Sequence, residues 1–131
     1  MLFRSYAILC ANTMAQDAAI EALESGEGDV AMMRKEYEAR RNFIVRSLND
    51  MGLPCFKPLG AFYVFPDITS TGLMSKEFSL RLLKEKQVAC VPGPAFGESG
   101  KGHVRCSYAT SMEKIKIAMQ RMAEFVAEVR K

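Results

Sequence analysis

The chain has 131 residues, of which 49% are hydrophobic and 25% are charged, and its net charge is +3. These values predict one globular core and exclude extensive disorder. The basic excess is too small to indicate a nucleic-acid binder. No apolar stretch reaches the ~20 residues of a membrane span, and the apolar N-terminal segment is too short for a signal peptide. We therefore expect a cytoplasmic protein with neither a nucleic-acid nor a membrane partner.

Two helices are predicted in the first part of the chain. Thr13 and Gln16 have the spacing of a capping box, so the first helix is expected to open at Thr13. It ends at the Ser-Gly-Glu-Gly break of residues 25–28. A longer helix runs from about Asp29 to a cap at Gly52, which suits a left-handed C-terminal residue. Its apolar stripe is formed by Met33, Tyr37, Ile44 and Leu48.

The middle of the chain changes to strand periodicity. Residues 61–65 are aromatic and β-branched, lie between Gly60 and Pro66, and predict a strand buried on both faces. A helix then follows, with Ser75 as its expected cap and Lys86 near its end. Its predicted inward residues are Phe78, Leu82 and Leu83.

Two strands and a helix complete the predicted fold. Residues 88–91 and 103–109 are expected to form strands joined by a Gly- and Pro-rich loop, which predicts a hairpin. Ser111 caps the final helix, whose inward stripe is Ile115, Ala118, Met119, Met122, Phe125, Val126 and Val129. The expected fold class is α+β: a two-layer domain with a short mixed or mainly antiparallel sheet and helices packed on one face.

The cysteines do not indicate a metal site. Cys10, Cys55, Cys90 and Cys106 lie far apart along the chain, and the only histidine is His103. A zinc site requires closely spaced Cys and His ligands. Two disulfides would be an alternative in a secreted chain. We favour buried apolar thiols in a reducing compartment, and we predict no metal.

Arg105 is the most informative single residue. It lies in the middle of a predicted strand, on the same face as His103 and Ser107. One interpretation is a structural salt bridge, or an edge strand that leaves the arginine in water. The other is a receptor that binds a carboxylate through two hydrogen bonds. Nearby, the aromatic residues Phe62, Tyr63 and Phe65 are more typical of a core than of a cofactor platform.

Three segments together resemble the C-terminal part of class I/II aminotransferases, the pyridoxal-phosphate enzymes of fold type I. They are Gly60-Ala-Phe-Tyr-Val-Phe, Val91-Pro-Gly-Pro-Ala-Phe-Gly97 and Val104-Arg-Cys-Ser-Tyr-Ala109. The resemblance implies that Arg105 binds the α-carboxylate of an amino-acid substrate, and that Gly60 and Phe62 lie beside that substrate. It also implies that Asn12 and Thr13 lie near the subunit interface and approach the cofactor site of the partner.

The resemblance has one important departure. The family's Schiff-base lysine and its aspartate on the pyridine nitrogen belong to the large domain, upstream of these segments. Lys57, Lys76 and Lys101 do not match the cofactor-lysine motif. We therefore predict no catalytic residue in this chain. We expect it to be a piece of an aminotransferase. Residues 1–28 would come from the large-domain and interface region, and residues 29–131 would form the C-terminal small domain.

Several functional expectations follow from the resemblance. The intact parent would use pyridoxal phosphate to move an amino group from an amino acid to a 2-oxo acid, whereas this chain alone would bind no cofactor and be inactive. We expect a homodimer, because the N-terminal segment is apolar, from Leu2, Phe3, Tyr6, Ile8 and Leu9 to the helix opening at Thr13. The alternative is a non-catalytic binding module that keeps the small-domain fold.

Overall fold

The computed structural model describes residues 11–130 and forms two compact units, residues 1–35 and residues 36–131. Cys10 and the five apolar residues predicted to drive association, Leu2 to Leu9, lie outside the described part. No described helix is long and apolar enough to cross a membrane. The predicted division at residue 28 differs from the contact boundary by seven residues and stays a prediction about domain origin.

The first unit consists of helix α2 (Thr13–Ser25) and the start of α3 (Glu27–Asp50). The cap of α2 is Asn12 rather than the predicted Thr13, because the Asn12 side-chain oxygen accepts a hydrogen bond from the Ala15 amide at 2.8 Å. No residue of α2 is buried. The predicted inward position of Met33 is wrong, since its side chain is exposed. The exposed large apolar residues of this unit are Met14, Ile20, Leu23, Val30, Met32 and Met33.

The second unit begins within α3, which buries Ile44 and Leu48. The helix ends at Asp50 and is capped by Gly52, as predicted: Gly52 has a φ of 78° and its amide donates to the Asn49 carbonyl, and the Leu53 amide donates to that of Leu48. These two bonds form a Schellman motif, in which a glycine takes the left-handed position without a steric penalty.

A small antiparallel sheet forms the second layer. Its strands are β1 (Tyr63–Val64), β2 (Val91–Pro92) and β3 (Val104–Ser107), in the order β1-β3-β2. Tyr63 pairs with Ser107 and Val91 pairs with Arg105, so β3 is the central strand. The predicted hairpin between the last two strands is confirmed, although both strands are shorter than expected.

The prediction of a strand buried on both faces at residues 61–65 is wrong. Val64 is buried, but Phe62, Tyr63 and Phe65 keep 36–39% of their surface exposed. The reason is that helices cover one face only, and alternate residues of the sheet point away from them. On β3, Val104 and Cys106 are buried, whereas Arg105 and Ser107 face the open side.

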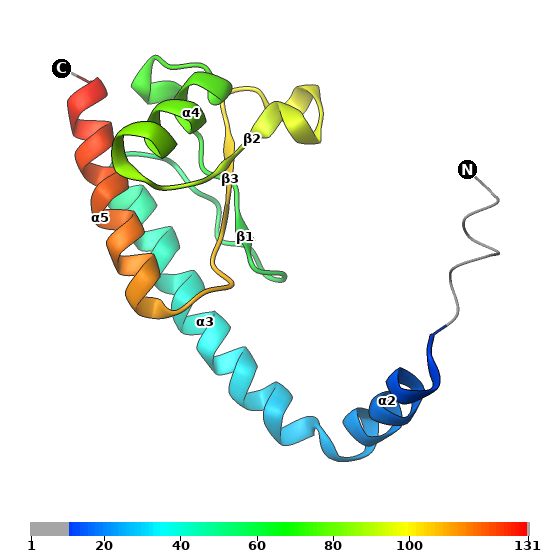
Figure 1. Cartoon of the computed structure of the whole chain (residues 1–131). Coiled ribbons are helices and arrows are strands. Elements are labelled where there is room, and N and C mark those ends of the chain that lie inside the picture. Colours follow the sequence, from blue (N-terminus) through cyan, green and yellow to red (C-terminus); the bar gives the residue numbers. More distant parts are fainter. Residues whose placement is uncertain (1–10, 131) are drawn as a thin grey trace, which may run out of the picture. The chain divides into compact units, whose positions relative to one another are not determined.

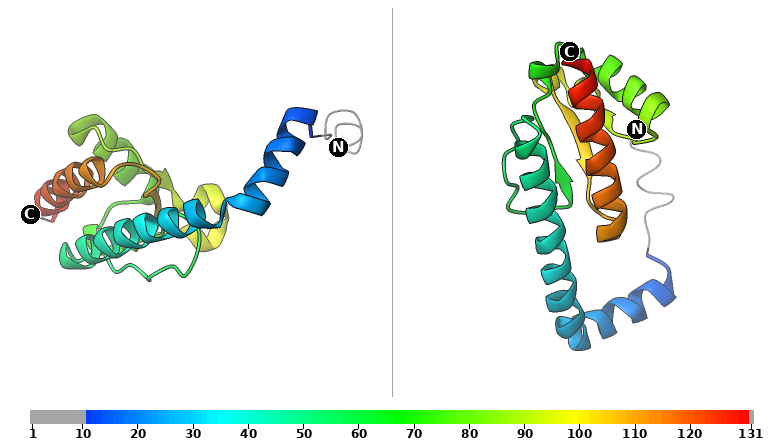
Figure 2. Two further views of the ribbon diagram at one scale, coloured as in Figure 1. Left: turned by 90° about the horizontal axis from the view of Figure 1, so that it is seen from below. Right: turned by 90° about the vertical axis from the view of Figure 1, so that its left-hand side faces the viewer.

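Two further helices complete the core. In α4 (Ser75–Lys86) the N-cap is Met74 rather than Ser75, and the predicted inward Leu83 is exposed while Ser79 is buried. In α5 (Met112–Val129) Ser111 is the cap, as predicted. Helices α3 and α5 lie side by side over one face of the sheet (Figures 1 and 2), and α4 packs against α5 and β2. The largest core residues include Leu48, Phe78, Leu82, Tyr108, Met122 and Phe125.

The architecture is therefore the predicted α+β arrangement of two layers. The helices bury one side of the sheet and leave the other side to carry polar and aromatic side chains.

Candidate functional site

Arg105 lies half-buried on the open face of the central strand. Its guanidinium carbon is 4.2 Å from the ring centre of Tyr63 and 4.2 Å from that of Phe96. Within residues 11–130, Arg105 forms no ion pair and no hydrogen bond through its side chain. The described structure therefore supports neither a structural salt bridge nor an edge-strand arginine.

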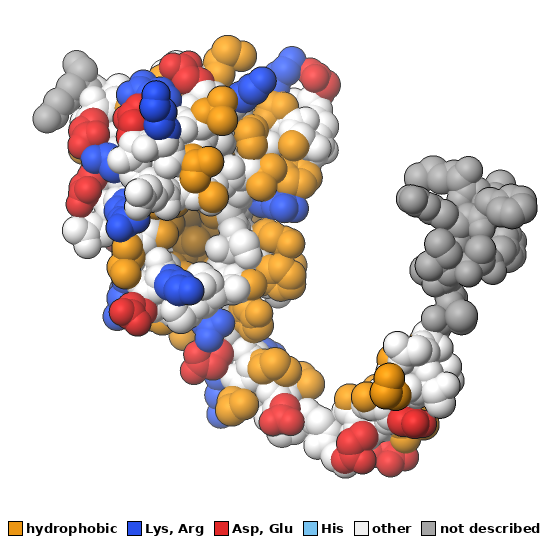
Figure 3. All heavy atoms as spheres, viewed as in Figure 1, with side chains coloured by type: hydrophobic (Ala, Val, Ile, Leu, Met, Phe, Trp, Pro, Cys, Tyr) orange, Lys and Arg blue, Asp and Glu red, His pale blue; other side chains and the backbone are white. Residues whose placement is uncertain are grey.

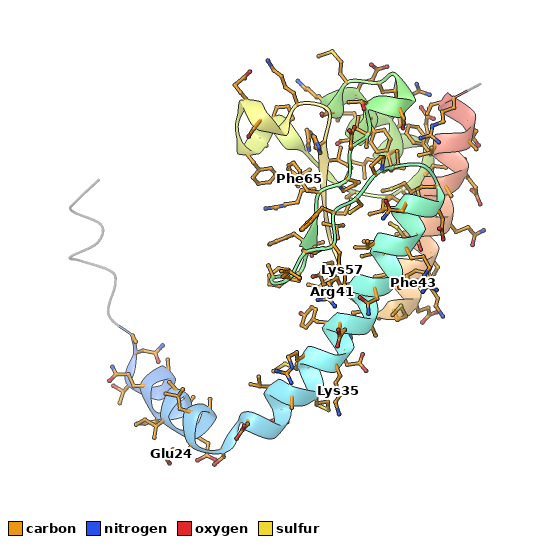
Figure 4. The ribbon with its side chains drawn as sticks, turned by 180° about the vertical axis from the view of Figure 1, so that it is seen from behind. Glu24, Lys35, Arg41, Phe43, Lys57 and Phe65 are labelled. Carbon is orange, nitrogen blue, oxygen red and sulfur yellow. The ribbon has the colours of Figure 1, made fainter. Side chains whose placement is uncertain are left out.

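The rings beside Arg105 belong to two small aromatic groups, one with Tyr63 and one with Phe96, and Arg105 contacts both. Phe62 lies 4.6 Å from Tyr63 and 6.2 Å from Tyr37 on α3, while Phe65 lies 6.1 Å from Phe96. Figure 4 shows Phe65 on the side of the strands that faces away from the helices. We call this set the aromatic row; its members are Tyr37, Phe62, Tyr63, Phe65 and Phe96.

The β1 end of the row is fixed by Tyr108, at the end of β3. The Tyr108 hydroxyl donates to the Ala61 carbonyl at 2.8 Å, and its backbone amide donates to the Phe62 carbonyl at 2.9 Å. Desolvation raises the pKa of Tyr108, so its hydroxyl stays a hydrogen-bond donor at neutral pH. These bonds hold the chain where Ala61 adopts a positive φ of 59° and turns into β1.

The other end of the row depends on the loop between β2 and β3. This loop holds two short 3₁₀ helices, η2 (Gly93–Phe96) and η3 (Glu98–Gly100). The Gly93 amide donates to the His103 carbonyl at 2.8 Å, and a Cβ on Gly100 would overlap the carbonyl oxygen of Gly93. Two backbone segments thus meet where only glycine fits, and this contact sets the position of Phe96.

We expect Gly100→Ala to disrupt this loop, because the new methyl group collides with backbone atoms that cannot rotate away. The variant should lose of order 1–3 kcal/mol of unfolding free energy, the usual magnitude of a strained backbone residue, measured by urea denaturation of the 131-residue chain. Gly60→Ala is the matched control, since nothing lies within 4 Å of its added Cβ. Equal stabilities for the two variants would contradict the steric argument.

The other predicted site residues are placed as follows. Phe62 belongs to the aromatic row, and Gly60 lies exposed two residues before it. Asn12 and Thr13 belong to the first unit, and their interface role stays a prediction. His103 stacks on Phe65 and its Nδ1 lies 3.0 Å from the Lys101 carbonyl oxygen, so it supports the row.

No sequence pattern predicts a role for Phe96 at this site. Phe96 lies within a quoted family segment, but its spacing from Arg105 along the chain gives no sign that the two side chains meet. Its flanking glycines were the available signal, because closely spaced glycines mark places where a loop turns back on itself.

The three described cysteines are free. Cys106 is buried and hydrogen-bonded to Cys90, which raises the pKa of Cys106 and lowers that of Cys90. Cys55 is half-buried, and burial raises its pKa. Among the described cysteines, the prediction of buried thiols is confirmed for Cys106, whereas Cys55 and Cys90 are half-buried.

Arg105 does not line the apolar groove beside α4. This groove has a volume of about 980 Å³ and lies between α4 and the loop after β2. Figure 3 shows apolar side chains interspersed with Lys and Arg on this face. Its lining is almost wholly apolar and offers few polar groups to orient a substrate. The side chains around it include Leu73, Met74, Lys76, Leu80, Arg81 and Lys101.

The geometry can be compared with known proteins. Residues 3–122 match the family described as aminotransferase class I and II. The chain is 52% identical over 121 residues to the putative aminotransferase YugH of Bacillus subtilis, covering 92% of this chain and 31% of that protein. It is 52% identical over 128 residues to aromatic-amino-acid aminotransferase 2 of Thermococcus litoralis, covering 96% and 33%.

Solved structures agree with the sequence relatives. The aromatic aminotransferase of Pyrococcus horikoshii matches with a TM-score of 0.89 and 50% identity, over 97% of this chain and 34% of that one. The aspartate aminotransferase of Thermus thermophilus with maleate matches with a TM-score of 0.83 and 38% identity, over 94% and 32%. The chain belongs to the class I and II aminotransferase family. It spans about a third of the length of these relatives.

Proposed function

We propose that this chain is the C-terminal small domain of a pyridoxal-phosphate-dependent aminotransferase, and that Arg105 binds the α-carboxylate of the substrate. The observation that supports this proposal most directly is an arginine on a central strand with no carboxylate partner in the described chain. A charge held there without a protein partner is suited to an anionic ligand. Residues 29–131 form the small domain in this proposal, and residues 1–28 derive from the region next to it.

The described residues do not fit a complete cofactor site. Pyridoxal phosphate requires a lysine for the Schiff base, and such a lysine is usually desolvated so that its amine can react. Lys57, Lys76 and Lys101 are exposed, and Lys101 pairs with Glu98. Lys86 is the one described lysine that is not exposed, and its ammonium pairs with Glu128 at 2.7 Å. We therefore assign the cofactor to the large domain of the complete enzyme, and this chain alone is expected to be inactive.

The contribution of this chain is to hold and orient the substrate. A guanidinium carries five N–H donors in one plane, and this geometry matches the two oxygens of a carboxylate. Binding both oxygens fixes the rotation of the substrate about its carboxylate, so that its α-carbon is held in one orientation. Phe62 and Gly60 then lie close to the bound substrate, on the β1 side of the row.

Positive charge also borders the loop that precedes β1. Figure 4 shows Arg41 on α3 beside the loop that carries Lys57, and Arg41 contacts the Pro58 carbonyl at 3.5 Å. Arg41 also pairs with Glu38 at 3.0 Å, so Lys57, which has no ion pair in the described structure, is the charge that would favour the approach of anionic 2-oxo acids. The similarity to an aspartate aminotransferase with maleate, which is itself a carboxylate, supports the same ligand class.

The proposal extends to assembly and location. The six exposed apolar side chains of the first unit, from Met14 to Met33, would be covered in a homodimer in which Asn12 and Thr13 approach the partner's active site. The enzyme would act in the cytoplasm.

The experiment is to complete the enzyme. The part of YugH that lies outside its match to this chain is joined to these 131 residues, and transamination is measured with amino-acid and 2-oxo-acid pairs. We expect the chimera to be active and each part alone to be inactive. A folded chimera that binds pyridoxal phosphate but never transfers an amino group would favour a non-catalytic binding module.

A further inference from the structure

We infer that Tyr63 and Phe96 are positioning residues that clamp the Arg105 guanidinium between their rings and present its N–H edge to a carboxylate. This inference rests on the proposed role of Arg105. An arginine is usually oriented by hydrogen bonds to neighbouring groups. For Arg105, we assign this orienting role to the two rings instead.

Two aromatic rings lie over the Arg105 guanidinium. The guanidinium carbon lies 4.2 Å from each ring centre, inside the ~6 Å range of cation–π contacts. The two rings come from different elements, Tyr63 from β1 and Phe96 from the end of η2. Two rings this close restrict rotation of the guanidinium, and no described ion pair or hydrogen bond occupies its N–H donors.

The two rings are not core residues. Tyr63 is 36% exposed and Phe96 is 49% exposed, whereas the core aromatics Phe78 and Phe125 are fully buried. Large aromatic side chains this exposed contribute little to the core. Their positions therefore favour contact with the Arg105 guanidinium, and not with the core.

Two other arginines provide an internal comparison. Arg40 lies 5.4 Å from the Tyr37 ring and pairs with Glu36, and Arg81 lies 5.5 Å from the Phe125 ring and pairs with Glu85. Each therefore has one ring and one carboxylate. In the described chain Arg105 has two closer rings and no carboxylate, so its N–H donors remain available.

The rings are themselves supported by neighbouring groups. Phe62 packs on Tyr63 at 4.6 Å, and Phe65 packs on Phe96 at 6.1 Å. The Gly93–Gly100 contact fixes the loop that carries Phe96. A site held in place before the ligand arrives loses less conformational entropy on binding.

The test uses nuclear magnetic resonance of the ¹⁵N-labelled 131-residue chain. Protons above an aromatic ring shift upfield, so the side-chain N–H signals of Arg105 should lie upfield and move downfield in Tyr63→Leu and Phe96→Leu. Titration with pyruvate as the carboxylate probe, against sodium chloride at equal ionic strength, should shift these signals. Each leucine variant should weaken pyruvate binding by roughly threefold to tenfold.

Three controls separate positioning from folding and from the proposed function. Phe96→Tyr keeps an aromatic ring at this position, so it should retain both the upfield shift and the affinity for pyruvate. Phe56→Leu replaces an exposed ring outside the row and should change neither. Thermal unfolding of every variant checks stability. If Phe96→Leu and Tyr63→Leu bind pyruvate as the parent chain does, the inference is overturned while Arg105 keeps its role. If Arg105→Ala binds pyruvate as well as the parent chain does, the carboxylate role and the clamp are both overturned.

Discussion

Replacing Arg105 by alanine in the complete enzyme should lower kcat/KM for every amino-acid substrate by about two to four orders of magnitude. The α-carboxylate is common to all of these substrates, so no substrate escapes the loss. Removing one side of a charge-assisted bidentate pair costs roughly 3–5 kcal/mol when the other charge stays desolvated. Steady-state kinetics with aliphatic, acidic and aromatic amino acids measures the effect.

Two further variants sharpen this test. Arg105→Lys should rescue little activity, because an ammonium group cannot reproduce the planar fork of the guanidinium. Arg46→Ala removes an exposed arginine of α3 that has no ion pair in the described structure, and it should leave kcat/KM nearly unchanged. If Arg105→Ala affected one substrate and spared the others, Arg105 would instead select a side chain.

Phe125→Ala should be the most destabilising single truncation that we predict for the chain itself. Phe125 is fully buried in α5, and its ring meets that of Phe78 edge-on at 5.3 Å between centres. Truncation loses this contact and leaves a cavity that the surrounding helices fill only in part, which costs about 3–5 kcal/mol. Urea denaturation followed by circular dichroism measures the change.

The matched control is Ile117→Ala in the same helix. Ile117 is 45% exposed, so its truncation should change the free energy of unfolding by less than about 1 kcal/mol. Similar losses in the two variants would mean that α5 does not bury the face that contains Phe125.

Local patterns along the chain were sufficient to predict much of this fold. The apolar spacing of α5 predicted its buried residues Ile115, Met119, Met122, Phe125 and Val126, because one helical face meets one core. Gly52 predicted the end of α3, because its left-handed cap is a property of three or four adjacent residues. The hairpin of β2 and β3 followed from two apolar runs and one loop.

Other features depended on what packs against each segment. The aromatic run at residues 61–65 has the composition of a core strand, yet only Val64 is buried. The composition of a segment shows that its side chains prefer an apolar environment. It does not show whether a second layer of helices covers the sheet. The cap of α2 shifted from Thr13 to Asn12, because two neighbouring polar residues compete for the same amides and the backbone geometry selects one of them. In α4 the cap is Met74, whose side chain makes no capping hydrogen bond, and Ser75 is instead buried as the first residue of the helix.

Arg105 shows most directly which features follow from the sequence and which depend on the tertiary structure. The sequence alone determined that a permanent positive charge lies in a strand and that its face is the polar one, because alternation along a strand is local. Only the tertiary structure decided that this strand is central, that no described carboxylate reaches the guanidinium, and that the rings of Tyr63 and Phe96 both lie over it. These facts depend on contacts between residues far apart in the chain, and the backbone contact of Gly93 with Gly100 that positions Phe96 exists only once the loop has closed.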